Sequence, residues 1–113
     1  MGLDDTLIAL ADPTRRAILD RLGRGPARVT DVARPFAISL NSVSKHIRLL
    51  ERADLVRRQV TGREHLLSLN TGPLDEAERW IHAHRAFWTA QLDDLETRLQ
   101  AMKGAERRKG RRQ

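Results

Sequence analysis

Six polar side chains lie on one face of a predicted helix in the middle of the chain, and all of them can donate hydrogen bonds. They are Asn41, Ser42, Ser44, Lys45, Arg48 and Arg52. Short amide and hydroxyl groups can reach the edges of DNA bases, and basic groups bind phosphates or guanine. With no carboxylate among them, these side chains are typical of a helix that enters a major groove. An ordinary solvent-exposed helix face is the alternative.

Apolar residues in the same stretch predict how these polar groups are held. They recur every three or four positions, which indicates an amphipathic helix with one buried stripe. The stripe consists of Leu40, Val43, Ile47 and Leu50. Ser39 is placed to cap this helix, and residues 29–36 begin like a helix capped by Thr30, which Pro35 keeps short. A short helix, a tight turn and a basic helix form the helix-turn-helix arrangement.

A basic hairpin is predicted directly after this helix. Residues 55–60 and 64–69 read as two strands, and residues 61–63 form a short loop that contains Gly62. Leu67 is expected to face inward together with Leu69. Three arginines make the hairpin basic: Arg57, Arg58 and Arg63. Such a hairpin can act as a wing that lays an arginine along the DNA backbone or in a minor groove.

Two helices are predicted before the helix-turn-helix. The first begins near Leu3 and ends near Ala11. Asp12 then caps a second helix over residues 13–22, because proline at the first helical position loses no hydrogen bond. Arg15 and Arg16 on that second helix are expected to point outward, toward phosphate or solvent.

The last predicted helix begins at Pro73 and carries a long apolar stripe. Its positions are Leu74, Ala77, Ile81, His84, Trp88, Leu92, Leu95, Leu99 and Met102. The stripe spans about 28 residues, or ~42 Å, which is too long for a small domain to cover alone. Exposed aromatics on such a stripe are usually an interface. Packing within the chain is the alternative, and it accounts for only part of the stripe.

We therefore predict a homodimer built on this last helix, with the first helix packed against it. The predicted interface consists of Leu3, Leu7, Trp80, Ile81, His84, Trp88, Leu92 and Leu95.

The net charge of +6 is unevenly distributed along the 113 residues. Residues 13–63 carry eleven Arg and one Lys against four acids, a net +8, whereas residues 64–102 carry three Arg against seven acids, a net −4. The basic block coincides with the basic helix and the hairpin, which is typical of a phosphate-binding face. A general arginine bias is the alternative, but it does not explain the change of sign after residue 63.

The charge pattern also predicts the domain organisation. Residues 1–102 are expected to form one domain that binds DNA and dimerises. Residues 103–113 carry six bases and one acid and are interrupted by glycine. They are expected to form a basic, disordered tail that adds non-specific affinity for DNA.

Several classes of protein are disfavoured. The chain has no cysteine, so it has neither disulfides nor a thiolate metal site. No run approaches the ~20 apolar residues of a membrane-spanning helix, so we expect no membrane partner. It also lacks a glycine-rich phosphate loop, a nucleophile with a plausible base, and paired carboxylates, so we do not expect an enzyme. A cytoplasmic location fits the acidic N-terminus, which lacks the basic start of a secretory signal.

Taken together, these segments make the chain similar to the ArsR-type winged-helix repressors. The matching pieces are residues 10–16 with Ile18-Leu19, residues 44–47 with 49–51, residues 53–56, and Gly62-Arg63. The resemblance covers residues ~5–100, and the set in this order is quite specific. It implies a mainly α protomer with a two-stranded hairpin, in the order α-α-α-α-β-β-α, that dimerises through its terminal helices. It also implies repression at an operator of two inverted half-sites.

The chain departs from the metal-sensing members of that family. Their cysteines lie in the first helix of the helix-turn-helix, where this chain has residues 32–36 without a thiol. Glu78 and His82 lie one turn apart on the last helix and are the candidate pair for a second family site. His84 lies on another face, and no further acid–His pair follows. We therefore predict no metal and no cofactor.

The sequence thus predicts a homodimeric repressor that reads double-stranded DNA. His46, inside the Ser-Lys-His motif, is expected to be structural or to contact phosphate, and His65 to belong to the wing. The alternative is a winged-helix protein-interaction module that does not read DNA. Whether a small-molecule effector binds near Trp80, Phe87 and Trp88 stays open, since those aromatics also suit a dimer core.

Overall fold

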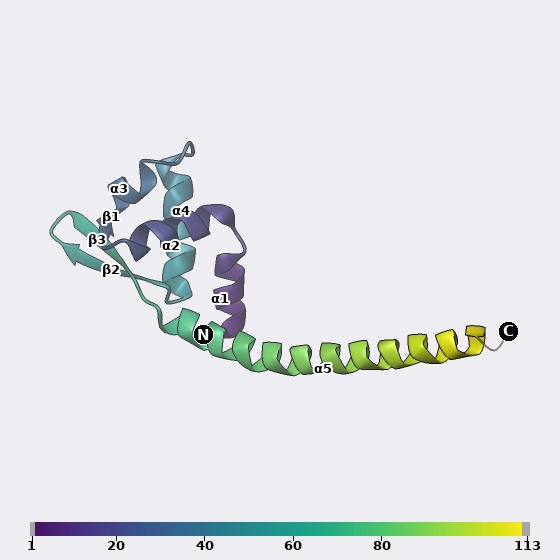
Figure 1. Ribbon diagram of the computed structural model, residues 1–113. Helices are drawn as coiled ribbons and strands as arrows, with labels where there is room; N and C mark the ends of the chain where they lie inside the picture. The colour runs from purple at the N-terminus through teal and green to yellow at the C-terminus, as the bar shows by residue number, and fades with distance from the viewer. Residues whose placement is uncertain (1, 112–113) are drawn as a thin grey trace. The chain divides into compact units, whose positions relative to one another are not determined.

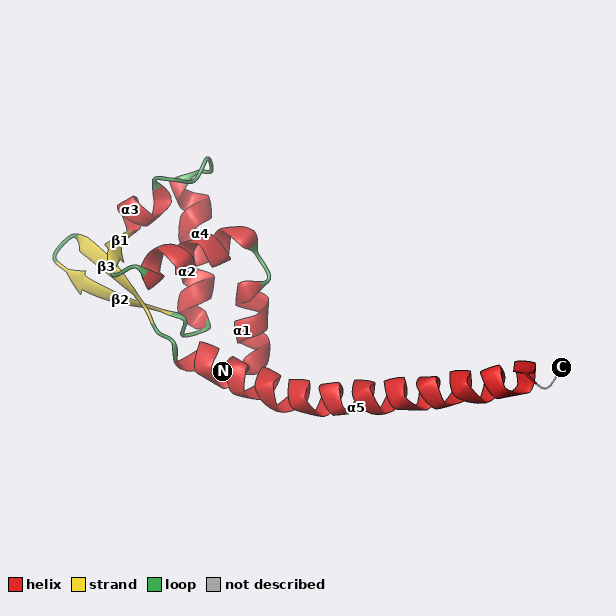
Figure 2. Cartoon of the chain, viewed as in Figure 1, coloured by secondary structure: helices red, strands yellow, loops and turns green. Residues whose placement is uncertain are grey.

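The computed structural model describes the backbone of residues 2–111 and the side chains of residues 2–105. It contains five helices and three strands within that range (Figures 1 and 2). Contacts divide the chain into a first unit that ends at Glu78 and a second that begins at Arg79.

Helices α1 (Leu3–Leu10) and α2 (Pro13–Gly23) open the first unit. The Asp12 carboxylate accepts a hydrogen bond from the backbone N–H of Arg15, which confirms the predicted cap of α2. Helix α1 packs inward through its small residues. Thr6 and Ala9 are buried, whereas Leu7 and Ile8 are exposed and Leu3 is half-buried. The small residues allow α1 to lie close to its neighbours, and the larger ones remain uncovered.

The helix-turn-helix consists of α3 (Val29–Ala33) and α4 (Leu40–Arg52). Ser39 caps α4 as predicted, because its hydroxyl accepts from the Ser42 backbone N–H. The residue at the N-cap position of α3 is Arg28, two residues before the predicted Thr30. Leu40 is also a correction, since it is exposed at the first turn of α4, before the helix reaches the core.

Strands β2 (Val56–Thr61) and β3 (Glu64–Leu69) form the predicted hairpin. Gly62 begins its two-residue turn with φ of 62°, a left-handed conformation that glycine adopts without strain. A third strand was not predicted: β1 (Ala27–Arg28) pairs with β3 and completes a sheet of order β1-β3-β2. The first unit is therefore a winged helix-turn-helix with a three-stranded sheet rather than a bare hairpin.

The core of the first unit joins α2, α4 and the sheet. Its largest fully buried side chains are Ile18, Val32, Val43, Ile47, Leu50, Leu55 and Leu67. The predicted inward residue Leu67 is fully buried, and Leu69 packs against the core from a half-buried position. Burial of one face of α4 leaves its opposite face exposed, so the core fixes which side chains of α4 can meet a partner.

Helix α5 (Gly72–Arg111) begins in the first unit, where Leu74 packs against the core and Ala77 is buried. It is longer than predicted, because the backbone stays helical past Met102. The division into a domain over 1–102 and a tail over 103–113 stays a prediction, and the side chains of 106–113 lie outside the described residues. No helix within residues 2–111 has the length and apolar character needed to cross a membrane.

Candidate nucleic-acid interface

One exposed stripe of α4 carries four of the predicted DNA-binding residues. Asn41, Lys45, Arg48 and Arg52 follow each other at intervals of four, three and four residues. At 100° per residue they fall within a sector of roughly 60°, and they span about 16 Å along the helix. All four are exposed, and Lys45, Arg48 and Arg52 line a shallow hollow of about 160 Å³. The stripe is a continuous surface of hydrogen-bond donors.

The two predicted serines flank this stripe in half-buried positions. Ser42 lies in the first turn, where its hydroxyl is 3.0 Å from the Ser39 hydroxyl. Ser44 lies on the other side of the stripe. Both side chains are short, so a partner can approach the backbone of α4 closely at its N-terminal end.

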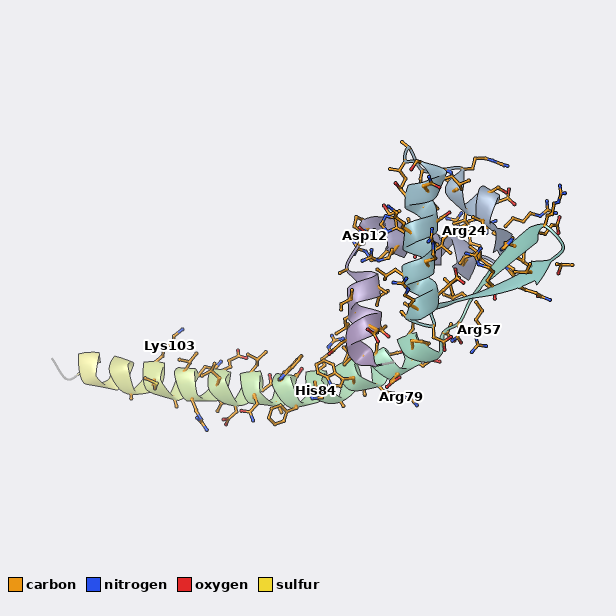
Figure 3. The ribbon with its side chains drawn as sticks, turned by 180° about the vertical axis from the view of Figure 1, so that it is seen from behind. Asp12, Arg24, Arg57, Arg79, His84 and Lys103 are labelled. Carbon is orange, nitrogen blue, oxygen red and sulfur yellow. The ribbon has the colours of Figure 1, made fainter. Side chains whose placement is uncertain are left out.

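His46 does not lie on the exposed stripe but faces α2. Its Nδ1 is 3.4 Å from Arg15 Nη1 and 3.7 Å from a carboxylate oxygen of Asp12. Asp12 lies at the turn between α1 and α2, beside α4 (Figure 3). The backbone N–H of Arg15, the charge of His46 and that of Arg15 together lower the pKa of Asp12, although burial opposes them. The contacts of His46 are therefore structural ones that connect α4 to α2.

Arg16 is exposed as expected, whereas Arg15 is half-buried, and both guanidinium groups bind backbone carbonyls of α1. Arg15 donates from Nε to the Ala9 carbonyl at 2.8 Å and from Nη2 to the Ile8 carbonyl at 2.9 Å. Arg16 Nη1 donates to the Leu10 carbonyl at 2.7 Å. The last carbonyls of a helix have no partner within it, so guanidinium groups from α2 satisfy the C-terminus of α1.

The three predicted hairpin arginines have different surroundings. Arg58 is half-buried and donates two hydrogen bonds to Glu51 at 2.7 and 3.3 Å, with His65 Nδ1 3.0 Å away. Arg57 is exposed near the base of the hairpin (Figure 3), and its Nε is 3.9 Å from Asp54. Arg63 is exposed in the turn. Arg58 thus connects β2 to α4, whereas Arg57 and Arg63 present their charge to solvent.

A second basic hollow, of about 350 Å³, lies between the start of α3 and the hairpin. Besides Arg58, Arg63 and His65, it is lined by Arg28 and Thr30, which we did not predict as interface residues. Arg28 forms a salt bridge with Glu64 at 3.0 Å across β1 and β3. The sequence contained one indication that Arg28 could belong to the interface, namely its position in the basic block of residues 13–63.

On α5, the predicted interface side chains from Trp80 onward are partly or largely exposed. His84 (labelled in Figure 3) stacks on Trp80 with ring centroids 4.1 Å apart, and Trp88 meets Trp80 edge-on at 6.1 Å. Leu92 and Leu95 are exposed one and two turns further along. Glu78 and His82 are both exposed, and among the described side chains no three metal-ligating groups gather.

Known proteins resemble this chain in sequence and in fold. Residues 10–59 match the family model described as a helix-turn-helix domain. The chain is 35% identical over 79 residues to the transcriptional repressor SdpR of Bacillus subtilis, covering 70% of this chain and 88% of that protein. It is 42% identical over 84 residues to the HTH-type transcriptional regulator Rv2034 of Mycobacterium tuberculosis, covering 74% and 76%. The crystal structure of an ArsR family transcriptional regulator matches with a TM-score of 0.73 at 38% identity, covering 79% of this chain and 97% of that one.

Proposed function

Since the chain belongs to the ArsR family of DNA-binding transcriptional regulators, we propose that it is a homodimeric repressor whose operator consists of two inverted half-sites. It is a regulator and not an enzyme. A twofold-symmetric dimer presents the same surface twice, so its operator repeats one half-site in opposite orientations. We propose that the protein acts in the cytoplasm.

The exposed donor stripe of α4 supports the proposal most directly. We assign Asn41, Ser42, Ser44 and Lys45 to base edges, because they lie in the N-terminal half of α4 and are short or flexible. Four exposed arginines are assigned to phosphates and the minor groove, because among the described side chains their only ion pair is the 3.9 Å contact of Arg57 with Asp54: Arg48, Arg52, Arg57 and Arg63. We assign His46 and Arg58 to holding α4 and the hairpin in position, given their contacts with Asp12 and Glu51.

Exposed apolar side chains support the homodimer. Trp80, Ile81, Trp88, Leu92 and Leu95 are each between 41% and 64% exposed on α5. A contiguous stripe of this kind is unfavourable in water and usually marks an interface. We include Leu3, Leu7 and His84 in the same interface.

Two alanine variants separate base reading from phosphate binding. Lys45→Ala should weaken binding to the preferred duplex by about 1–3 kcal/mol. The affinity of this variant for random duplex should stay nearly unchanged. Arg63→Ala should weaken binding to both duplexes equally. It should also reduce the slope of log affinity against log salt concentration by about one unit at most. Arg24→Ala, at the exposed end of α2, is the matched control and should change neither.

The measurement is fluorescence anisotropy with a duplex selected from random DNA and with its scrambled version. Equal losses on both duplexes for Lys45→Ala would exclude its role in base reading. Failure of the unmodified protein to bind any duplex at low salt would instead favour the protein-interaction module.

A further inference from the structure

Two large apolar side chains are exposed at the N-terminal end of α4, although helical spacing predicts one of them in the core. Leu40, the first residue of the helix, is 53% exposed, and Ile38, two residues earlier, is 43% exposed. The core side chains of the same helix begin at Val43, which is fully buried. Leu40 therefore contributes little to holding α4 against the rest of the first unit.

The place of Leu40 also separates it from the start of the long last helix. In the first unit, the N-terminal end of α4 adjoins the loop that comes from α3 (Figure 1). The C-terminal end of α4 adjoins the start of α5, since Ala53 lines the same hollow as Gly72 and Pro73. Leu40 lies roughly 18 Å along the helix axis from Arg52, the last residue of α4. It thus lies at the end of α4 to which we assign the contacts with bases.

Leu40 and its neighbour Asn41 have side chains that suit the two bases of an A·T pair. Asn41 is exposed on the donor stripe, and an asparagine amide can bind the N6 and N7 edge of adenine. Thymine places a 5-methyl group in the same major groove. An exposed leucine that covers this methyl group gains free energy, because both apolar surfaces leave water.

The flank of α4 on which Leu40 lies leaves room for such a contact. At 100° per residue, Leu40 is about 40° around the helix from Ser44, so the two share one flank of the donor stripe. The side chain of Ser44 is short, and a base can therefore approach the helix closely beside Leu40. Ile38 lies outside the helix, before the Ser39 cap, so we assign it no base contact.

From these observations we propose that Leu40 is a specificity-determining residue, and that it contacts the 5-methyl group of a thymine at or next to the pair bound by Asn41. The inference rests on the proposed base reading by α4 and adds an apolar contact to its hydrogen bonds. Each half-site consequently contains an A·T pair where the N-terminal end of α4 enters the groove.

Replacement of thymine by uracil tests the contact, because uracil keeps the hydrogen-bonding groups of thymine and lacks only the methyl group. The probe is a duplex selected from random DNA, in which each thymine is replaced in turn. At one position the unmodified protein should lose about fourfold in affinity, which corresponds to one buried carbon of this size. Leu40→Ala should bind the thymine and uracil forms of that duplex with equal affinity. Fluorescence anisotropy measures the dissociation constants.

Two further variants separate the contact from effects on folding. Leu40→Met keeps an apolar side chain of similar volume, so it should still prefer thymine over uracil by about twofold or more. Ile38→Ala removes a comparably exposed apolar side chain outside the helix and should keep the fourfold preference. Urea unfolding should show that Leu40→Ala is as stable as the unmodified protein, because alanine favours helix and Leu40 is half exposed.

The possible failures can be told apart. The thymine contact would be overturned, with sequence-specific binding intact, if no uracil replacement weakened binding of the unmodified protein. An equal loss on the uracil duplex for Leu40→Ala and for the unmodified protein would also overturn it. A preference lost in Ile38→Ala but kept in Leu40→Ala would overturn the assignment to Leu40. Failure of the unmodified protein to select any duplex would overturn the proposed base reading itself.

Discussion

Neighbouring arginines of the hairpin have different partners, and the difference predicts different consequences of removing them. Arg58 and Glu51 are both about three-quarters buried and share two hydrogen bonds, whereas Arg57 is largely exposed. Arg58→Ala leaves the Glu51 carboxylate partly desolvated without a partner, so we expect it to lower the free energy of unfolding by about 1–3 kcal/mol. Arg57→Ala should change it by less than about 0.5 kcal/mol.

Urea unfolding of both variants measures this difference, and DNA binding provides the complementary readout. Arg57→Ala should reduce affinity for every duplex while leaving the stability of the fold unchanged. Equal losses of stability in the two variants would show that the Arg58–Glu51 contact does not hold the hairpin to α4.

Asp12 gives a pH dependence whose direction follows from its contacts. Its pKa is lowered from the ordinary value of 3.8, chiefly because its carboxylate accepts a hydrogen bond from the Arg15 backbone. A carboxylate with a lowered pKa stabilises the folded state fully above about pH 3.8. That contribution disappears as the pH falls through the lower pKa of the folded state.

Asp12→Asn keeps a good helix cap and removes the titrating charge. The unmodified protein should therefore be more stable than this variant at pH 7, and the gap should shrink at pH 3. Thermal unfolding of both proteins at the two pH values measures this difference in stability. A gap of the same size at both would show that the charge of Asp12 does not contribute.

At the residue scale, the sequence predicted which side chains α4 exposes but not which other groups they contact. Lys45 and Arg48 followed from helical spacing, because the buried stripe fixes the exposed one. His46 belongs to the same helix, yet its partners Asp12 and Arg15 lie more than thirty residues away in the chain. Nothing local in the sequence indicates such contacts.

At the element scale, local signals were sufficient where one residue determines a boundary. Asp12 and Ser39 cap the helices that they were predicted to cap, and Gly62 forms the hairpin turn. Strand β1 was missed because two residues carry no alternation, and its partners Leu66 and Leu67 are nearly forty residues away. Leu40 was misplaced because helical spacing does not show where a helix leaves the core.

The hairpin turn provides a prediction at the same scale. Gly62 has φ of 62°, so Gly62→Val should strain the turn and lower the free energy of unfolding by about 1–2 kcal/mol. It should also weaken DNA binding, because Arg63 follows directly. Gly23→Ala is the matched control: it lies in helix α2 with open space around an added methyl group, and it should be neutral or slightly stabilising. Urea unfolding of both variants measures this difference. A Gly62→Val variant with the same free energy of unfolding as the unmodified protein would contradict the prediction.

At the scale of the molecule, the unequal distribution of charge is the feature that the sequence revealed most directly. The basic block of residues 13–63 contains the α4 stripe and the hairpin arginines. The change of sign after residue 63 coincides with β3 and the first three-quarters of α5. The length of α5 was underestimated, because the apolar stripe that predicted it ends at Met102. Basic side chains thus gather in residues 13–63, whereas the exposed apolar stripe lies on α5.

The most direct test of sequence-specific binding is the salt dependence of anisotropy for the unmodified protein. The two DNAs are a duplex selected from random sequence and its scrambled version. We predict a preference of about 10³-fold or more for the selected duplex, with affinity falling steeply as salt rises. Equal affinity for the two duplexes at every salt concentration would contradict sequence-specific binding by α4 and leave only attraction between basic side chains and phosphate.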